Sequence, residues 1–109
     1  MDPDLQRLIA ENEDRARKVN EAIERGQWPG ERDAPSAFRC ECARPDCNRL
    51  VELTPREYER VRADPRRFLL VEGHERPEIE TVVAAERDYL VVEKRDEAGV
   101  RAEETDPRA

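Results

Sequence analysis

The stretch FRCECARPDCNRLVELTP, residues 38–55, carries the strongest structural signals in this chain. Apolar residues recur in its two halves, and ARPD at positions 43–46 is a turn-forming sequence. The pattern predicts two short strands, over residues 38–42 and 48–53, that pair as a hairpin. All three cysteines of the chain lie in this hairpin, within a single stretch of eight residues, 40–47.

This clustering of thiols predicts a zinc site. Zinc binds thiolates well, and tetrahedral coordination needs sulfur atoms that a tight turn brings to about 2.3 Å from one centre. Because residues i and i+2 of a strand point to the same face, we expect Cys40 and Cys42 to start on one side and Cys47 to return across the turn. The only histidine, His74, follows Gly73, where the backbone can turn, so His74 is the expected fourth ligand.

The residues alone leave two alternatives open at this site. In the first, His74 is a surface histidine, and water or Asp46 completes the coordination. In the second, the chemistry is redox: Cys40 and Cys42 form a strained disulfide, and Cys47 is the resolving thiol.

Downstream of the hairpin the sequence predicts one helix and three more strands. Thr54, Pro55 and Glu57 supply an N-cap, a first-turn proline and a capping box, so a short helix is expected to run to about residue 63. Residues 67–72, 79–85 and 89–94 are rich in Val, Leu and Ile and are expected to be strands. The predicted fold class is therefore α+β, with a zinc-stapled domain at 38–95 of order strand-strand-helix-strand-strand-strand.

The first 26 residues predict a long amphipathic helix, over about 4–25. Its apolar positions follow heptad spacing with one polar member and form a narrow seam: Leu5, Ile9, Asn12, Ala16, Val19 and Ile23. Two interpretations compete. The helix either covers the downstream sheet, or it pairs with a partner protein's helix or with a second copy. Residues 27–37 are expected to be a linker, because the stretch 26–37 contains two Gly and two Pro and has no periodicity.

Charge and composition bound the remaining choices. The net charge is −7, and residues 96–109 are acidic and poor in apolar residues, so a disordered tail is expected there. An acidic chain is repelled on average by nucleic acid and by anionic membranes, and no apolar run is long enough to span a bilayer. An odd number of cysteines and the lack of an apolar signal-peptide core at the start favour the cytoplasm.

The cysteine hairpin and the segments after it also resemble a known family. The residues that carry the likeness are F-x-C-E-C, the third Cys, L-T-x-x-E-Y-E-x-V-R, P-x-x-F and G-H, within about 38–94. This pattern is similar to that of a family of small bacterial proteins of unknown function. The resemblance implies Cys40, Cys42, Cys47 and His74 as the ligand set, and it implies no known reaction.

The sequence argues against catalysis. It has no Gly-rich phosphate loop, no Ser-His-Asp set and no second histidine, so a catalytic zinc would need an open position and a base such as Glu41 or Glu72. We therefore expect a non-enzymatic, zinc-finger-like module that acts as an interaction or regulatory protein through its N-terminal helix. The alternative is a thiol-based redox sensor that uses the same cysteines.

Overall fold

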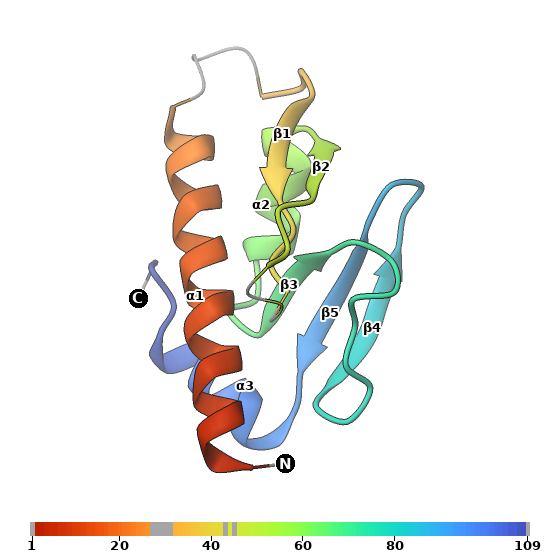
Figure 1. The fold of residues 1–109 in the computed structure, drawn as a ribbon. Coiled ribbons are helices and arrows are strands. Elements are labelled where there is room, and N and C mark those ends of the chain that lie inside the picture. The colour runs from red at the N-terminus through yellow and green to blue at the C-terminus, as the bar shows by residue number, and fades with distance from the viewer. Residues whose placement is uncertain (1, 27–31, 43, 45, 109) are drawn as a thin grey trace.

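A computed structural model describes residues 2–26, 32–42, 44 and 46–108 of the chain (Figure 1). Within them the chain has an α+β fold, as the sequence predicts, and the order strand-strand-helix-strand-strand-strand is confirmed. The elements are α1 Pro3–Arg25, β1 Ser36–Arg39, β2 Leu50–Leu53, α2 Pro55–Arg62, β3 Arg67–Leu70, β4 Glu80–Ala85, β5 Leu90–Lys94 and α3 Asp96–Glu104.

The strands form two small antiparallel sheets. β1 pairs with β2, and β5 lies between β3 and β4 in a three-stranded sheet. A register shift between Val82 and Ala84 marks an irregularity in β4, which is an edge strand. α2 begins at the predicted capping box: Thr54 accepts from the Glu57 N–H, and the Glu57 carboxylate accepts from the Thr54 N–H at 2.8 Å.

The core consists of two apolar clusters on opposite faces of β3. Leu69 packs into the first cluster with residues of β1, β2, α2 and β5, where the Phe38 and Tyr58 rings stack with centroids 4.7 Å apart. Phe68 and Leu70 pack into the second, together with Val92 and the three cysteines. This alternation along one strand places the cysteines against the second face of the sheet.

α1 packs along the body of the protein through a largely polar face (Figure 1). Ile9 and Ala16 of the predicted seam are buried, but Leu5 and Val19 are exposed. The buried face is completed instead by charged and amide side chains, Glu13, Arg17, Asn20 and Glu21. The helix therefore covers its own domain, and the face that does so is rotated from the predicted seam.

Arg17 shows how a polar helix face can be buried. Its guanidinium donates to the Pro65 carbonyl at 2.7 Å and to the Ala102 carbonyl at 3.0 Å. It also lies over the Phe68 ring, 4.4 Å from the centroid, and it is fully buried. Buried charges of this kind need such partners, because an unpaired one would lose its hydration without compensation.

The predictions for the two segments of low apolar content need correction. A disordered tail over 96–109 is wrong for its described part: Asp96–Glu104 is α3, with Gly99 and Ala102 buried. The predicted linker ends earlier than residue 37, because Ser36 and Ala37 already pair with β2; residues 27–31 lie outside the described part. Side chains of α1 form hydrogen bonds with α3 and the residue after it, for example from Arg17 to the Ala102 carbonyl and from Thr105 to Asp14. The composition of residues 96–109 could not indicate these tertiary contacts.

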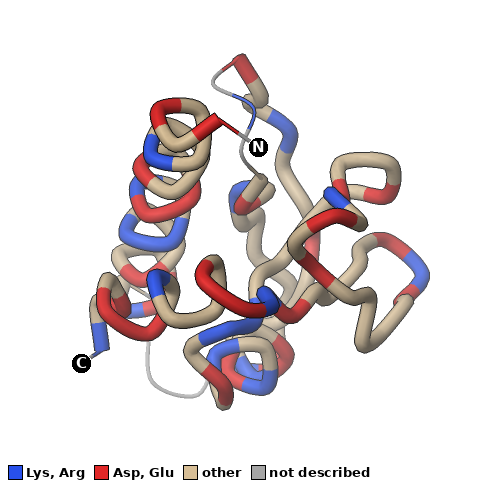
Figure 2. The backbone as a smooth tube through the Cα atoms, turned by 90° about the horizontal axis from the view of Figure 1, so that it is seen from below, with Lys and Arg blue, Asp and Glu red and all other residues tan. Residues whose placement is uncertain are grey.

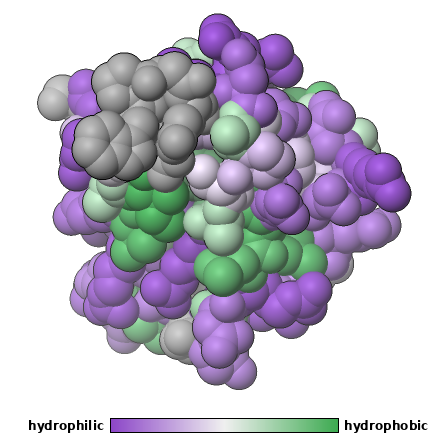
Figure 3. Space-filling view, turned by 90° about the horizontal axis from the view of Figure 1, so that it is seen from above, coloured by the Kyte–Doolittle hydropathy of each residue, from purple (hydrophilic) through white to green (hydrophobic). Residues whose placement is uncertain are grey.

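The surface is mainly hydrophilic. Acidic and basic residues are interspersed over the body (Figure 2), and only small apolar patches interrupt the polar surface seen from above (Figure 3). Among the described residues, no helix is both long and apolar enough for a membrane span.

Candidate metal centre

Three separated segments bring the predicted ligands together. Cys40 and Cys42 follow β1, Cys47 precedes β2, and His74 lies in the turn after β3. The Sγ atoms of Cys40 and Cys47 are each 3.7 Å from Nδ1 of His74, and the ligand atoms of all four residues lie within 4.8 Å of one another. Sulfur and nitrogen ligands at tetrahedral zinc distances are separated by roughly 3.5–3.8 Å. The two 3.7 Å separations therefore suit one metal ion.

The backbone around the cysteines differs from the predicted strand. β1 ends at Arg39, so Cys40 and Cys42 lie directly after the strand and not within it, although the sequence predicts a strand over residues 38–42. The Cys40 N–H still donates to the Arg49 carbonyl at 3.0 Å, while the Glu41 N–H turns to β3 and donates to Leu69 at 2.6 Å. The chain leaves the small sheet at this point because its next partner is the edge of β3.

Gly73 performs the role that the sequence predicts for it. Its φ of 93° lies in the left-handed region, which favours glycine, and the His74 N–H donates to the Val71 carbonyl at 3.0 Å. The turn directs the imidazole of His74 towards the cysteines. Asp46, the alternative fourth ligand, is exposed in its turn, and the cluster contains His74 instead.

The pKa values of Cys40 and Cys42 are shifted in opposite directions. The Cys40 thiol donates a hydrogen bond to the Cys42 sulfur, which lowers the pKa of Cys42 to about 4; the N–H of Arg44 acts in the same direction. That hydrogen bond and burial raise the pKa of Cys40. Without a cation, the cluster therefore holds one thiolate readily and resists a second beside it. A divalent ion removes this conflict because it neutralises adjacent thiolates.

Further hydrogen bonds hold the ligand-bearing segments in place. The Val71 N–H donates to Sγ of Cys40 at 3.2 Å, an interaction that stabilises a thiolate. Arg44 donates to the Gly73 carbonyl at 3.2 Å and so links the cysteine hairpin to the histidine turn. Outer contacts of this kind orient the ligands of a metal site.

Glu41, between two of the cysteines, is the important residue whose role sequence reasoning missed. It is fully buried, and its carboxylate accepts from the Tyr58 hydroxyl at 2.6 Å and from Asn20 Nδ2 and the Leu69 N–H, both at 2.9 Å. Burial raises the pKa of Glu41, whereas these donors oppose the shift. A signal was present: in an extended chain the residue between two ligands points away from them, and here that direction is the core.

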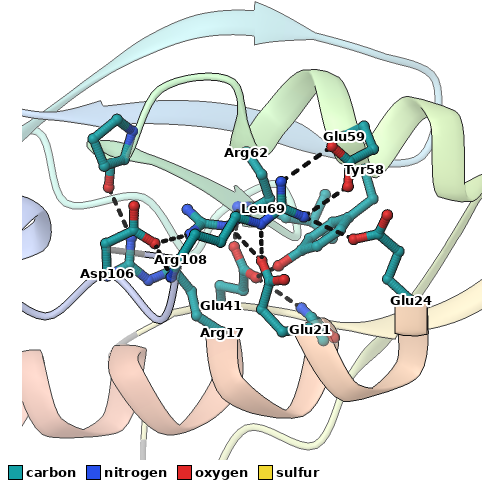
Figure 4. A network of polar contacts seen from close by, with 12 residues as sticks. Arg17, Glu21, Glu24, Glu41, Tyr58, Glu59, Arg62, Leu69, Asp106 and Arg108 are labelled. Carbon is teal, nitrogen blue, oxygen red and sulfur yellow. Dashed lines mark hydrogen bonds and ion pairs between the residues drawn. The ribbon is translucent and has the colours of Figure 1, made fainter. Parts of the chain in front are cut away.

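A network of charged residues surrounds Glu41 (Figure 4). Arg62 of α2 donates to Glu21 of α1 at 2.8 Å and also pairs with Asp106. Arg108 reaches the same Glu21 oxygen at 2.8 Å. The C-terminal segment, α1 and α2 are thus joined beside the segment that carries the cysteines.

Glu72, the other candidate base for a catalytic metal, is exposed. Glu41 is buried with its carboxylate bound by three donors.

The candidate metal centre combines two thiols from the segment after β1, a third thiol from across the turn and an imidazole from the turn after β3. Such a donor set suits a soft or borderline divalent cation.

The family resemblance rests on residues that the fold brings together, but the family itself is unconfirmed. Family models, curated proteins and solved structures were each compared with this chain, and none of them matches it.

Proposed function

We propose that this protein is a non-enzymatic zinc-binding module of the cytoplasm in which Cys40, Cys42, Cys47 and His74 hold one structural ion. The observation that carries the proposal is the meeting of four ligand atoms within 4.8 Å, from segments up to 34 residues apart. Zinc is the proposed metal because it is borderline soft and accepts three thiolates and one imidazole in a tetrahedron.

A structural role follows from the ligand count. Four protein ligands fill a tetrahedral shell and leave no position for substrate or an activated water. Glu41, a buried carboxylate next to the cysteines, is bound by Asn20, Tyr58 and Leu69. Acid-base catalysis at the metal would need a carboxylate free to exchange a proton with a bound molecule.

The ion would stabilise a fold that has a thin core. The chain is 43% charged, and its apolar clusters are small. Structural zinc supplies an apparent ~10–16 kcal/mol in small peptides, more than the ~3–5 kcal/mol expected from a small hydrophobic core. Zinc would join the cysteine hairpin to the turn after β3 and so reinforce the hydrogen bonds from Arg44 to Gly73 and from Val71 to Cys40.

The proposal also assigns α1 to protein interaction. The helix uses one face on its own domain, while Leu5, Leu8 and Val19 remain 39–47% exposed on another. Apolar side chains on an exposed helix face are typical of helix-helix contacts. The redox alternative receives less support, because all three thiols are buried and oxidants react fastest with accessible thiolates.

Metal analysis of the purified protein tests the metal site. We expect one zinc per chain, and a cobalt-substituted sample should show the absorption of a tetrahedral thiolate site. Cys47→Ser and His74→Ala should each reduce metal retention during dialysis against a mild chelator. Asp46→Asn, in the same turn as Cys47, is the matched control and should retain the ion.

Two outcomes would overturn the metal site: a folded wild-type protein that takes up no zinc, or ligand variants that hold zinc as tightly as Asp46→Asn. Peroxide titration separates the structural role from redox sensing. A structural site should keep its zinc at oxidant concentrations that oxidise free cysteine, whereas a sensor should release zinc there.

A further inference from the structure

The surface of α1 carries a second heptad pattern besides the face that packs on the domain. Its apolar and polar members follow spacings of three and four and form a stripe, called the outer stripe below: Leu5, Leu8, Asn12, Arg15, Val19 and Ala22. Leu5, Leu8 and Val19 are 43%, 47% and 39% exposed, and Ala22 is exposed as well. The stripe extends for roughly 26 Å along the helix at 1.5 Å per residue.

On the side of the outer stripe that faces the domain, every seventh residue of α1 packs against the rest of the protein. Ile9 and Ala16 are buried there, and Ile23 packs against the first apolar cluster. The body of the protein thus fixes α1, which runs along one side of the fold (Figure 1), and most side chains of the outer stripe are left exposed. A helix held in this way loses little conformational entropy when it pairs with another helix.

On the side of the outer stripe away from the domain, every seventh residue of α1 carries a charged side chain: Asp4, Glu11, Lys18 and Arg25. All four side chains are exposed. This row of side chains is acidic in the N-terminal half of the helix and basic in the C-terminal half. A partner helix with the opposite gradient would be attracted along its whole length.

A second copy of α1 offers this opposite gradient when it runs antiparallel. Around a two-fold axis that sets Leu8 level with Val19 of the second copy, Glu11 lies within two residues, roughly 3 Å along the helix, of Lys18 of that copy, and Asp4 lies equally near Arg25. In the same arrangement Leu8 meets Val19, Leu5 meets Ala22, and the polar pair Asn12 and Arg15 lies at the centre. Parallel pairing would instead align acidic half with acidic half and basic half with basic half.

We infer that the outer stripe of α1 is the interface of an antiparallel homodimer whose orientation is set by the Glu11–Lys18 and Asp4–Arg25 pairs. The inference deepens the interaction role proposed for α1, and it names the partner as a second copy of this chain. It does not depend on the metal ion. Asp4 also lies 3.7 Å from Arg7 of its own helix, so Glu11 and Lys18 are the better pair to test.

Sedimentation equilibrium of the full, zinc-loaded chain provides the test. A single helix pair gives a small interface of the transient class, so measurements should run from roughly 10 µM to 1 mM. We expect the mass to rise with concentration from 12.7 kDa towards twice that value. Leu8→Glu places a charge in the stripe and should keep the protein monomeric.

Charge reversal then tests the orientation. Glu11→Lys and Lys18→Glu each place two like-charged pairs across the two-fold axis, so each should weaken dimerisation by about tenfold. The double variant Glu11→Lys/Lys18→Glu restores opposite charges and should recover wild-type association. Glu86→Lys, an exposed position in the β4–β5 turn, is the control for net charge and should associate as the wild type does.

Zinc content and a thermal melt, measured on every sample, show whether a variant is folded. A wild-type protein that stays monomeric to 1 mM while holding one zinc per chain overturns the dimer and leaves the metal site intact. A dimer whose double variant is weaker than either single variant overturns the antiparallel pairing. Dimerisation without bound zinc would support the interface and contradict the proposed metal site.

Discussion

The side-chain amide of Asn20, in the C-terminal half of α1, donates to the carboxylate of Glu41 at 2.9 Å, and Glu41 lies between two of the candidate metal ligands. The same amide donates to the Arg39 carbonyl and accepts from the Arg39 N–H, both at 2.7 Å. One residue of α1 thus holds the backbone that enters the cysteine cluster. The position of the helix and the geometry of the metal centre are coupled through these contacts.

Asn20→Ala should damage both stability and metal binding. It leaves the backbone groups of Arg39 and part of the Glu41 carboxylate without partners, which costs about 2–3 kcal/mol of unfolding free energy. Zinc affinity should fall by about 10–100-fold, the usual effect of removing a contact that orients a ligand. Urea unfolding and chelator competition measure the two effects. Asn48→Ala, an exposed asparagine next to Cys47, should change neither.

Glu41→Gln tests whether the carboxylate itself is needed. The Glu41 carboxylate accepts hydrogen bonds from three donors, two side chains and one backbone N–H. In Glu41→Gln, the side-chain amide nitrogen is itself a donor and would face at least one of these donors. We expect a loss of at least about 2 kcal/mol of unfolding free energy and weaker zinc retention, although every ligand is still present. Glu52→Gln, on the exposed side of β2, is the matched control. Equal zinc affinity in the two variants would show that Glu41 does not orient the cysteines.

Removal of zinc should loosen α1. Without the ion, the segment 40–47 loses its link to His74, and the contacts from Asn20 to Arg39 and Glu41 then hold a less rigid backbone. Hydrogen exchange of amides in the second half of α1 should quicken by about tenfold or more after chelation. The β4–β5 hairpin serves as the internal reference. Faster exchange there, with α1 unchanged, would contradict the coupling.

Glu13 should make stability fall as pH rises. Burial raises the pKa of Glu13 from 4.5 to about 7, although the carboxylate pairs with Lys94. Because the folded protein holds this proton where the unfolded chain releases it, the contribution is fully present below pH 4.5 and is lost as the pH rises through 7. The loss amounts to up to about 3 kcal/mol.

Urea unfolding of the wild type and Glu13→Gln at the same series of pH values measures this contribution. The difference between the two proteins cancels the pH dependence of the metal ligands, which both share. We expect the wild type to lose stability relative to Glu13→Gln between pH 4.5 and about 7. Glu86→Gln, at an exposed position, should show no such trend, and a flat difference for Glu13→Gln would contradict the burial of a protonated carboxyl group.

Gly99→Ala tests the packing of α3. A Cβ atom at this position would lie 2.5 Å from Nη1 of Arg66 and 2.9 Å from the Lys94 carbonyl oxygen. The backbone oxygen cannot move away easily, so the substitution should cost about 1–3 kcal/mol, although alanine favours helices over glycine by about 1 kcal/mol. A thermal melt compares it with Val100→Ala, the exposed neighbour, for which little change is expected. A stabilised Gly99→Ala protein would mean that α3 is not docked.

Much of the local structure is determined by short-range signals in the sequence. The capping box at Thr54 and Glu57 and the proline at position 55 predict α2 to within a residue of its observed end. Runs of Val, Leu and Ile predict the strands after α2. The close spacing of the cysteines and the glycine before His74 predict the four ligands that the fold brings together. These features depend on neighbours in the chain, so the order of residues is enough to specify them.

Only the tertiary structure decides which charges are buried and which segments they join. Arg17, Asn20 and Glu41 look like surface residues in the sequence, because their burial depends on partners from distant elements. α3 is the clearest case: its segment is acidic and poor in apolar residues, yet it is helical, with the Ala102 carbonyl bound by Arg17 of α1. A polar residue can be buried when another segment meets its hydrogen bonds, and that condition is set by three-dimensional proximity, which no local pattern encodes.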